Sequence, residues 1–176
     1  VLKEPGRKAE TKSYVYCMRG GPPEKSVILY DYNEKSHQQF VSDWFEGFRG
    51  YLHVDADNFF EQIGQVVSLV NCNAHARRKF EPIVKATKGK GIAKEAMHFF
   101  KKLYGIEREA KNNQLSPEQR ATLREQKSKP LLDEFKQWLE EIYPTTLPQS
   151  PLGKALHYCI KWWPGLTRFL EDGRLE

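Results

Sequence analysis

Cysteine is scarce in this sequence of 176 residues, and long apolar runs are absent. Cys17, Cys72 and Cys159 are odd in number and far apart, which argues against a disulfide framework and favours a reducing, cytoplasmic environment. No apolar run approaches the roughly 20 residues that span a bilayer, so we expect no membrane partner. Hydrophobic residues make up 39% of the chain and aromatic residues 12%, so a packed core is expected and wholesale disorder is excluded.

Both ends of the sequence lack the features of natural termini. The segment Val1–Gly6 has no initiating methionine and no signal-peptide pattern, and it resembles the tail of a strand entering a turn. The segment Asp172–Glu176 stops without a terminal pattern. We therefore expect the sequence to be part of a longer protein.

Positive charge is concentrated in one segment of the chain. The formal net charge is +5, but the segment from Arg77 to Lys102 alone holds nine basic residues against two acidic ones. Such a local excess is typical of a surface that binds a polyanion. A solvated helix face would look the same, and charge alone does not separate the two interpretations.

The first half of the sequence predicts strands with short helices between them. Tyr14–Met18 and Val27–Tyr30 are β-prone and flank a Gly-Gly-Pro-Pro turn, which predicts an antiparallel hairpin, and Val1–Leu2 suggests an earlier strand. After a helix that Ser36 could cap, Tyr51–Asp55 and Val66–Val70 are predicted strands, the second apolar enough to be buried on both faces as in a parallel sheet. The fold class is therefore α/β with one mixed sheet.

The second half, from about Ala74, predicts helices throughout. Apolar residues recur at helical spacing from Ile92 to Ala110, and Ser116 and Ser150 each precede a proline in a helix-start pattern. Pro130 should kink or interrupt the helix that contains it. A stripe of Leu152, Ala155, Leu156, Cys159, Ile160 and Trp163 predicts the last long helix.

Asp55 is the first candidate for chemistry. It follows an apolar strand, and Asp57 lies two residues later. Carboxylates at the carboxyl ends of sheet strands are well placed to hold a divalent cation, and Mg²⁺ takes one or two of them together with water and phosphate oxygens. An aspartate in this position also commonly caps a helix or forms a turn.

Cys72 and His75 form a second candidate, a Cys-x-x-His pair. The spacing suits zinc, but zinc takes about four ligands and no second pair lies nearby in the sequence. A cysteine–histidine nucleophile pair would need the two groups within hydrogen-bond reach and a third group to orient them. A structural pair that closes the strand and begins a helix is the third possibility.

Arg77, Arg78 and Lys79 are the third candidate. They stand at the start of a predicted helix, where cations oppose the macrodipole, so helix stability does not explain them. An anionic partner is expected, and DNA phosphate is the main candidate. The nearby Gly89-Lys90-Gly91 is not a phosphate-binding loop, because it lacks the required order of glycine, lysine and hydroxyl residues.

Taken in order, three blocks resemble the insertion-sequence sixty-six family of transposases. They are Gly50–Asp55 (GYLHVD), Cys72–Phe80 (CNAHARRKF) and Trp163–Arg174 (WPGLTRFLEDGR). The resemblance extends over essentially the whole chain, and the second and third blocks together are specific where either alone would be weak.

This resemblance implies a ribonuclease H-like core interrupted by a helical insertion. The core would comprise residues 1–82, the insertion residues 83–171, and residues 172–176 would begin the return to the core. In the family, three acids (Asp, Asp and Glu) hold two Mg²⁺ ions, for which Mn²⁺ can substitute, in DNA strand cleavage and strand transfer. By position Asp55 is the second acid, and Cys72 and His75 match a structural element near the active site.

The resemblance also implies what this sequence lacks. The first acid would precede Val1 and the glutamate would follow Glu176, so the fragment is expected to be inactive alone. The implied partners are DNA, as transposon ends and target, and further copies of the protein in a bacterial cytoplasmic complex. The main alternative is a nucleic-acid-binding or interaction module without catalysis, and a zinc-stabilised domain is a third hypothesis.

Overall fold

The computed structural model describes residues 14–22, 25–33, 37–56, 58–61 and 67–175. The chain divides into two compact units, Val1–Phe48 and Arg49–Glu176. The boundaries at residues 82 and 171 that the family resemblance implies stay predictions. The predicted strand at Val1–Leu2 and the predicted cap Ser36 lie outside the described residues, as does Asp57.

The first unit is a β-hairpin with one helix. Strands β1 (Tyr14–Gly20) and β2 (Val27–Asn33) pair antiparallel, as predicted, and helix α1 (His37–Trp44) follows. The ring of Tyr16 stacks on Phe40 with centroids 3.8 Å apart, and the Trp44 indole donates a hydrogen bond of 2.8 Å to Asp31. Aromatic contacts thus join the helix to the hairpin.

The second unit contains the parallel strand pair β3 (Gly50–Val54) and β4 (Val67–Asn71), with helix α2 (Asn58–Glu61) between them. The parallel pairing confirms the prediction, and Leu69 and Val70, successive residues that point to opposite faces of β4, are both buried as predicted, whereas Ser68 is exposed. The described strands form two two-stranded sheets, β1–β2 in the first unit and β3–β4 in the second, and the predicted single mixed sheet stays a prediction.

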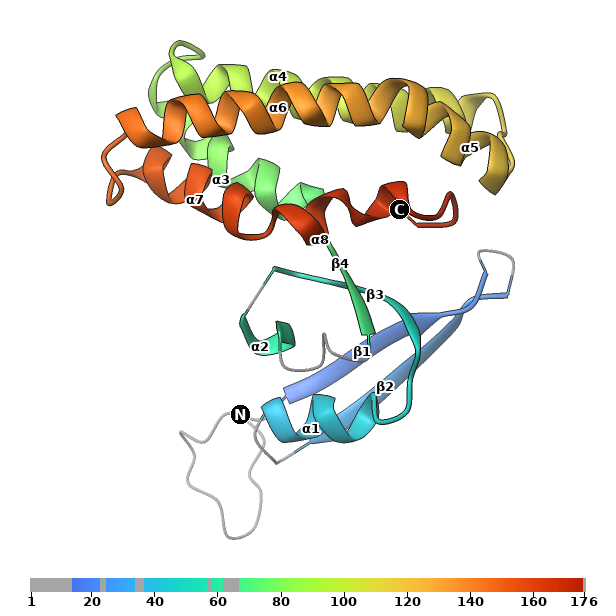
Figure 1. The fold of residues 1–176 in the computed structure, drawn as a ribbon. Helices are drawn as coiled ribbons and strands as arrows, with labels where there is room; N and C mark the ends of the chain where they lie inside the picture. Colours follow the sequence, from blue (N-terminus) through green and yellow to red (C-terminus); the bar gives the residue numbers. More distant parts are fainter. Residues whose placement is uncertain (1–13, 23–24, 34–36, 57, 62–66, 176) are drawn as a thin grey trace, which may run out of the picture. The chain divides into compact units, whose positions relative to one another are not determined.

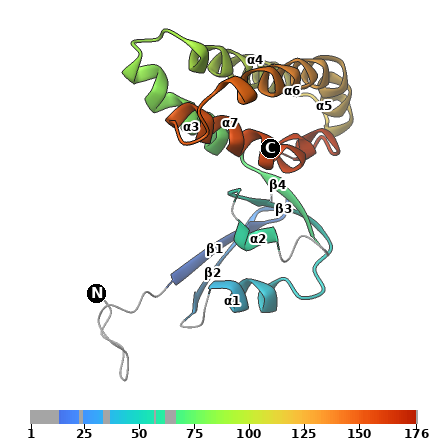
Figure 2. The same cartoon turned by 60° about the vertical axis from the view of Figure 1, so that its left-hand side comes forward.

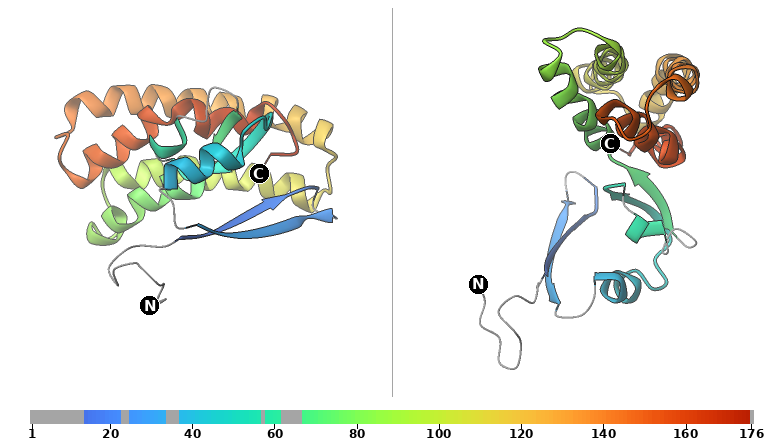
Figure 3. Two further views of the ribbon diagram at one scale, coloured as in Figure 1. Left: turned by 90° about the horizontal axis from the view of Figure 1, so that it is seen from below. Right: turned by 90° about the vertical axis from the view of Figure 1, so that its left-hand side faces the viewer.

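Helices make up the rest of the second unit (Figures 1 and 2). Helix α4 runs beside α6, and the end-on view in Figure 3 shows the long helices gathered around a common interior. Their bounds are α3 Asn73–Ala86, α4 Ile92–Asn112, α5 Pro117–Leu123, α6 Lys129–Ile142, α7 Pro151–Lys161 and α8 Trp163–Thr167. Among the described residues, no helix combines the length and apolar character needed to cross a membrane.

Two buried clusters hold this unit together. The larger one joins α3, α4, α6, α7 and α8 around Phe80, Phe100 and Phe135. The smaller one packs Val70 of β4 against Leu103, Leu132 and Phe169. Because the second cluster spans strand and helices, it fixes the carboxyl end of β4 against the helical part of the unit.

The predicted helix starts are confirmed, and the predicted stripe of α4 needs one correction. Ser116 forms a capping box with Gln119, and the Ser150 hydroxyl accepts a hydrogen bond from the Gly153 amide. The apolar residues at helical spacing were predicted to begin with Ile92, but Ile92 is 37% exposed, whereas Phe100 is 1% exposed. The buried face is therefore rotated away from Ile92.

Pro130 interrupts its helix as predicted. Because proline lacks an amide hydrogen and its ring crowds the preceding turn, a regular α-helix is unfavourable there. The chain instead forms a π-helical segment, Arg124–Ser128, immediately before α6.

Candidate functional site

The carboxyl ends of β3 and β4 form one wall of an open pocket. The parallel register pairs Val54 with Asn71, so Asp55 and Cys72, the next residues, lie at the same edge of the sheet. The Cys72 amide donates to the Val54 carbonyl at 3.2 Å and closes the strand pair. The pocket has a volume of about 360 Å³ and is lined by His53, Val54, Asp55, Cys72, Asn73, Ala74, Phe100, Leu103, Tyr104, Glu107, Arg124 and Phe169.

Asp55 presents its carboxylate at this pocket. Its side chain is 62% exposed, and Oδ1 lies 2.8 Å from Nδ1 of His75 in a close contact that lacks hydrogen-bond direction. Nη2 of Arg78 lies 2.9 Å from Nε2 of the same ring. Because a guanidinium only donates, a neutral His75 accepts at Nε2 and carries its proton on Nδ1, facing Asp55. His75 thus links the acid to an arginine.

Cys72 has a structural position in this arrangement. It is the N-cap of α3, and its carbonyl accepts from the His75 amide at 3.1 Å. Since the ring nitrogens of His75 face Asp55 and Arg78, the imidazole is not placed as a base for the Cys72 thiol. Within the described residues no three His, Cys, Asp or Glu side chains cluster as metal ligands, so the zinc hypothesis gains no support.

The three basic residues predicted to contact DNA each have a partner within the chain. Arg77 forms an ion pair of 2.8 Å with Glu81, one helical turn later. Arg78 contacts His75, and the Lys79 ammonium lies 4.9 Å from the centre of the Tyr158 ring. Arg78 and Lys79 are exposed, so contact with DNA phosphate stays a prediction for this segment.

Two tyrosines near the pocket were not identified from the sequence. Burial raises the pKa of Tyr104, which lines the pocket, and the neighbouring Cys72 raises it further. Burial also raises the pKa of Tyr158 to about 12, with a smaller contribution from the negative charge of Asp55. Both phenols therefore stay protonated at neutral pH and can donate hydrogen bonds.

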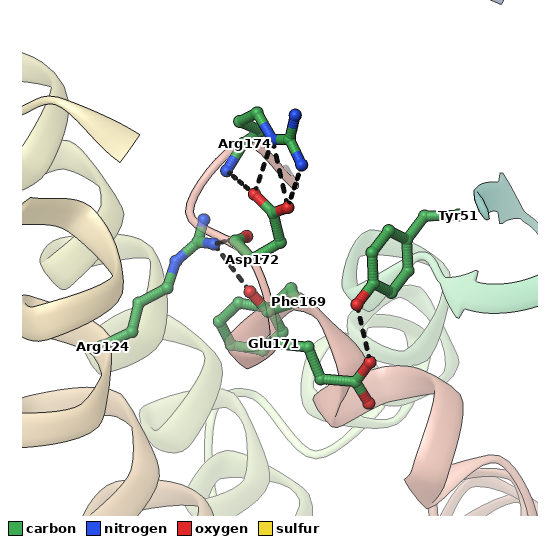
Figure 4. A network of polar contacts seen from close by, with 6 residues as sticks. All are labelled: Tyr51, Arg124, Phe169, Glu171, Asp172 and Arg174. Atoms are coloured by element: carbon green, nitrogen blue, oxygen red, sulfur yellow. Dashed lines mark hydrogen bonds and ion pairs between the residues drawn. The ribbon is translucent and has the colours of Figure 1, made fainter. Parts of the chain in front are cut away.

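Arg124 forms the opposite side of the pocket and was also missed. Its guanidinium is 1% exposed and uses all five of its N–H donors, and Figure 4 shows it beside Phe169 and Asp172. Two donors bind the Glu107 carboxylate at 2.8 and 2.7 Å. The other three bind the backbone carbonyls of Phe169, Asp172 and Leu175 at 2.7, 3.1 and 2.7 Å. One side chain thus joins α4 to the turn that follows α8.

The same turn has further polar contacts, visible in Figure 4. The hydrogen bond from the Arg174 side chain is the largest cause that lowers the pKa of Asp172 to about 2. The Tyr51 hydroxyl of β3 donates to Glu171 at 3.0 Å, and this bond raises the pKa of the phenol. The turn is therefore tied both to β3 and to Arg124.

The second and third sequence blocks meet in space, although about ninety residues separate them. The Asn73 amide donates to the Leu166 carbonyl at 3.0 Å, and Arg168 donates to the Leu69 carbonyl at 2.6 Å. Gly165 lies against Asn71 so closely that a Cβ atom there would sit 1.8 Å from Oδ1 of the buried asparagine. Glycine is therefore required where α8 crosses the end of β4.

These observations define a mixed α/β protein with a carboxylate at the open end of a parallel strand pair. The family model of the Transposase IS66 family matches residues 1–176. The chain therefore belongs to this family of transposases.

Two curated relatives match most of this chain, and both are named as uncharacterized proteins. The chain is 33% identical over 173 residues to the uncharacterized protein y4hP of Sinorhizobium fredii, which covers 89% of this chain and 31% of that protein. It is 31% identical over 162 residues to the uncharacterized protein y4jD of the same organism, covering 88% and 31%. The chain thus spans about a third of the length of these relatives. No solved structure matches it.

Proposed function

We propose that this chain is a central part of a transposase catalytic domain of the DDE type, with a ribonuclease H-like core and a helical insertion. In the full-length protein it would take part in metal-dependent DNA strand cleavage and strand transfer. The observation that supports this most is the position of Asp55, an exposed carboxylate directly after β3 at the edge of an open pocket. Membership of the transposase family supports the reaction class.

Asp55 has the chemistry of a magnesium or manganese ligand. These cations prefer carboxylate oxygens and keep several water molecules, which a pocket of about 360 Å³ can hold. Glu107 lines the same pocket, but Arg124 occupies its carboxylate. The described residues therefore provide one ligand, and further acids must come from other parts of the protein, as the family resemblance implies.

The residues around Asp55 would position it. His75 lies against Oδ1, and Arg78 fixes the orientation of the ring. A ring packed against the carboxylate in this way limits its rotation, and such neighbours of a metal ligand affect its affinity for the metal. A bound divalent cation would activate water or a DNA 3′-hydroxyl for attack on a phosphate. Arg77, Arg78 and Lys79 stay candidates for contact with the DNA backbone.

The partners proposed for the full-length protein are transposon-end and target DNA and further copies of itself, with the bacterial cytoplasm as the predicted location. A non-catalytic nucleic-acid-binding module is the second candidate. The observation that favours it is the concentration of positive charge from Arg77 to Lys102. The two functions differ in whether DNA is cut.

An assay of DNA cleavage in the presence of a divalent metal distinguishes the two candidate functions. We expect the full-length protein to cut duplex DNA that contains the transposon ends when Mg²⁺ or Mn²⁺ is present, and to stop when the metal is chelated, because Asp55 alone cannot activate a nucleophile. Products would be resolved on denaturing gels. Binding without cleavage in either metal would favour the non-catalytic module, and cleavage that survives chelation would exclude the proposed chemistry.

A further inference from the structure

A second charged surface lies on α4 and on the turn that leads into it. From Pro82 to Lys94 the chain contains four lysines and no acidic residue. The positive charge continues along α4 at intervals of seven residues. We call this surface the basic ridge; it comprises Lys85, Lys88, Lys90, Lys94, Lys101 and Arg108.

The part of the ridge on α4 faces solvent along its whole length. Residues seven apart in an α-helix lie within about 20° of the same direction, so Lys94, Lys101 and Arg108 form one line. All three are exposed, whereas the buried residues of α4, such as Ala96, Phe100 and Leu103, lie on the other side. At 1.5 Å per residue the line is about 21 Å long, comparable to about six base pairs of duplex DNA.

The charges of the ridge are not neutralised within the described part of the chain. No described acidic side chain forms an ion pair with any of the six residues. The two acids that flank the turn have other partners: Glu81 pairs with Arg77, and Glu95 accepts from the Trp138 indole. This distinguishes the ridge from Arg77, Arg78 and Lys79, which all have partners within the chain.

The helix dipole favours Lys85, in the last turn of α3, but local structure does not explain the other basic residues of the ridge. Lys88 has φ 51°, a left-handed conformation in which glycine or asparagine is less strained. Lys94 lies in the first turn of α4, where a cation opposes the helix dipole. Gly105 lies on the same line in mid-helix, where glycine is unfavourable, although nothing lies within 4 Å of the position its Cβ would take. Because glycine has no side chain, a ligand bound to the neighbouring cations can approach the helix backbone closely at this position.

The composition of the ridge favours one class of ligand. Residues 85–94 include no aromatic residue, so the turn lacks the stacking surface that single-stranded nucleic acid uses, and Ile92 is its one exposed large apolar side chain, where membrane-bound helices carry several. It also lacks the tryptophan, tyrosine and arginine that dominate protein–protein contacts. On α4, Lys94, Lys101 and Arg108 recur every seven residues, and such evenly spaced cations suit the regular phosphates of a duplex.

We propose that the basic ridge binds the phosphate backbone of duplex DNA. The choice of DNA rests on the proposed function. On α4 the ridge points away from Leu103, which lines the pocket, so it would supply phosphate contacts outside the pocket that holds Asp55.

The test is fluorescence anisotropy with a labelled 30-base-pair duplex of arbitrary sequence and the full-length protein. The ridge variant K85Q/K88Q/K94Q/K101Q is compared with K127Q/K129Q/K136Q/K154Q, which removes the same charge from exposed lysines elsewhere. We expect the ridge variant to bind about 10- to 100-fold more weakly and the salt dependence of log K to fall by about 3 to 4, since each phosphate contact contributes about 0.9. The matched variant should stay within about threefold of the unchanged protein.

Substitutions at Gly105 test whether DNA approaches α4 closely at this position, without any change of charge. Gly105→Gln places a bulky neutral side chain in the line and should weaken DNA binding about tenfold at low salt, whereas Gly105→Ala should have a smaller effect. Thermal unfolding of each variant checks that the fold is intact.

Three outcomes would overturn the proposal: equal weakening by the ridge and matched variants, no weakening by either, or loss of binding to phosphatidylserine vesicles with DNA binding unchanged. The last would assign the ridge to a membrane. Failure of metal-dependent cleavage, with ridge-dependent binding retained, would count against the proposed function alone.

Discussion

Replacing Asp55 with asparagine should lower metal-dependent DNA cleavage and strand transfer by the full-length protein by about 10³-fold or more, as loss of an essential catalytic group does. The amide keeps the shape of the side chain but loses the negative charge that attracts a divalent cation. Because the side chain is 62% exposed, the free energy of unfolding should change by only about 0.5 kcal/mol. Single-turnover cleavage assays in Mg²⁺ and in Mn²⁺ would measure the effect.

The matched control is Asp133→Asn. Asp133 is an exposed aspartate of α6 and does not line the pocket, so cleavage by this variant should equal that of the unchanged protein. DNA binding by the Asp55 variant should stay within about threefold of normal, because phosphate contacts by basic residues are unaffected. Full cleavage activity in the Asp55 variant would remove the basis for the proposed metal site.

Replacing Arg124 with methionine should cost about 3 to 5 kcal/mol of stability, the usual penalty for breaking a buried ion pair from one side. The change leaves the Glu107 carboxylate and the carbonyls of Phe169, Asp172 and Leu175 without their donors. Lysine would not restore the site, because an ammonium has three donors and cannot pair in a plane with a carboxylate. Thermal unfolding and amide hydrogen exchange of residues 168–175 would report the loss.

A double variant separates the contribution of the buried charge to stability from that of the shape of the side chain. In R124M/E107M both ions are removed, so much of the lost stability should return even though three carbonyls stay without donors. The exposed pair Lys127–Glu109 is the control, and Lys127→Met should cost less than about 1 kcal/mol. An Arg124→Met change as mild as the control would show that the five hydrogen bonds contribute little to folding.

Local sequence signals predicted much of the fold. The Gly-Gly-Pro-Pro turn between β-prone runs identified the hairpin, and the serine–proline pairs at residues 116 and 150 identified two helix starts. These signals work because capping and turn formation depend on neighbouring residues. The position of Pro130 likewise predicted an interruption, although not the π-helical form that it takes.

The site was predictable only in part, because its contacts join distant segments. The sequence identified Asp55 and Cys72 as separate candidates, each after a predicted strand, and the parallel register places them at one edge. Nothing in the local pattern indicated that His75 would lie beside Asp55, or that Arg124 would bind Glu107 and a turn more than forty residues later. Such partners depend on how the helices pack. The excess of basic residues was visible in the sequence. The sequence did not show which of these residues form ion pairs or other contacts within the chain.

The most direct test of the central claim, that Asp55 holds a divalent metal ion, is iron-directed backbone cleavage. Fe²⁺ replaces Mg²⁺ in the full-length protein, ascorbate and peroxide generate hydroxyl radicals, and mass spectrometry maps the cut sites. We predict cuts within a few residues of Asp55 and of Cys72, which line the same pocket, suppressed by excess Mg²⁺ and absent from the Asp55→Asn variant. Cuts only elsewhere in the chain, or a pattern unchanged by Asp55→Asn, would contradict the account.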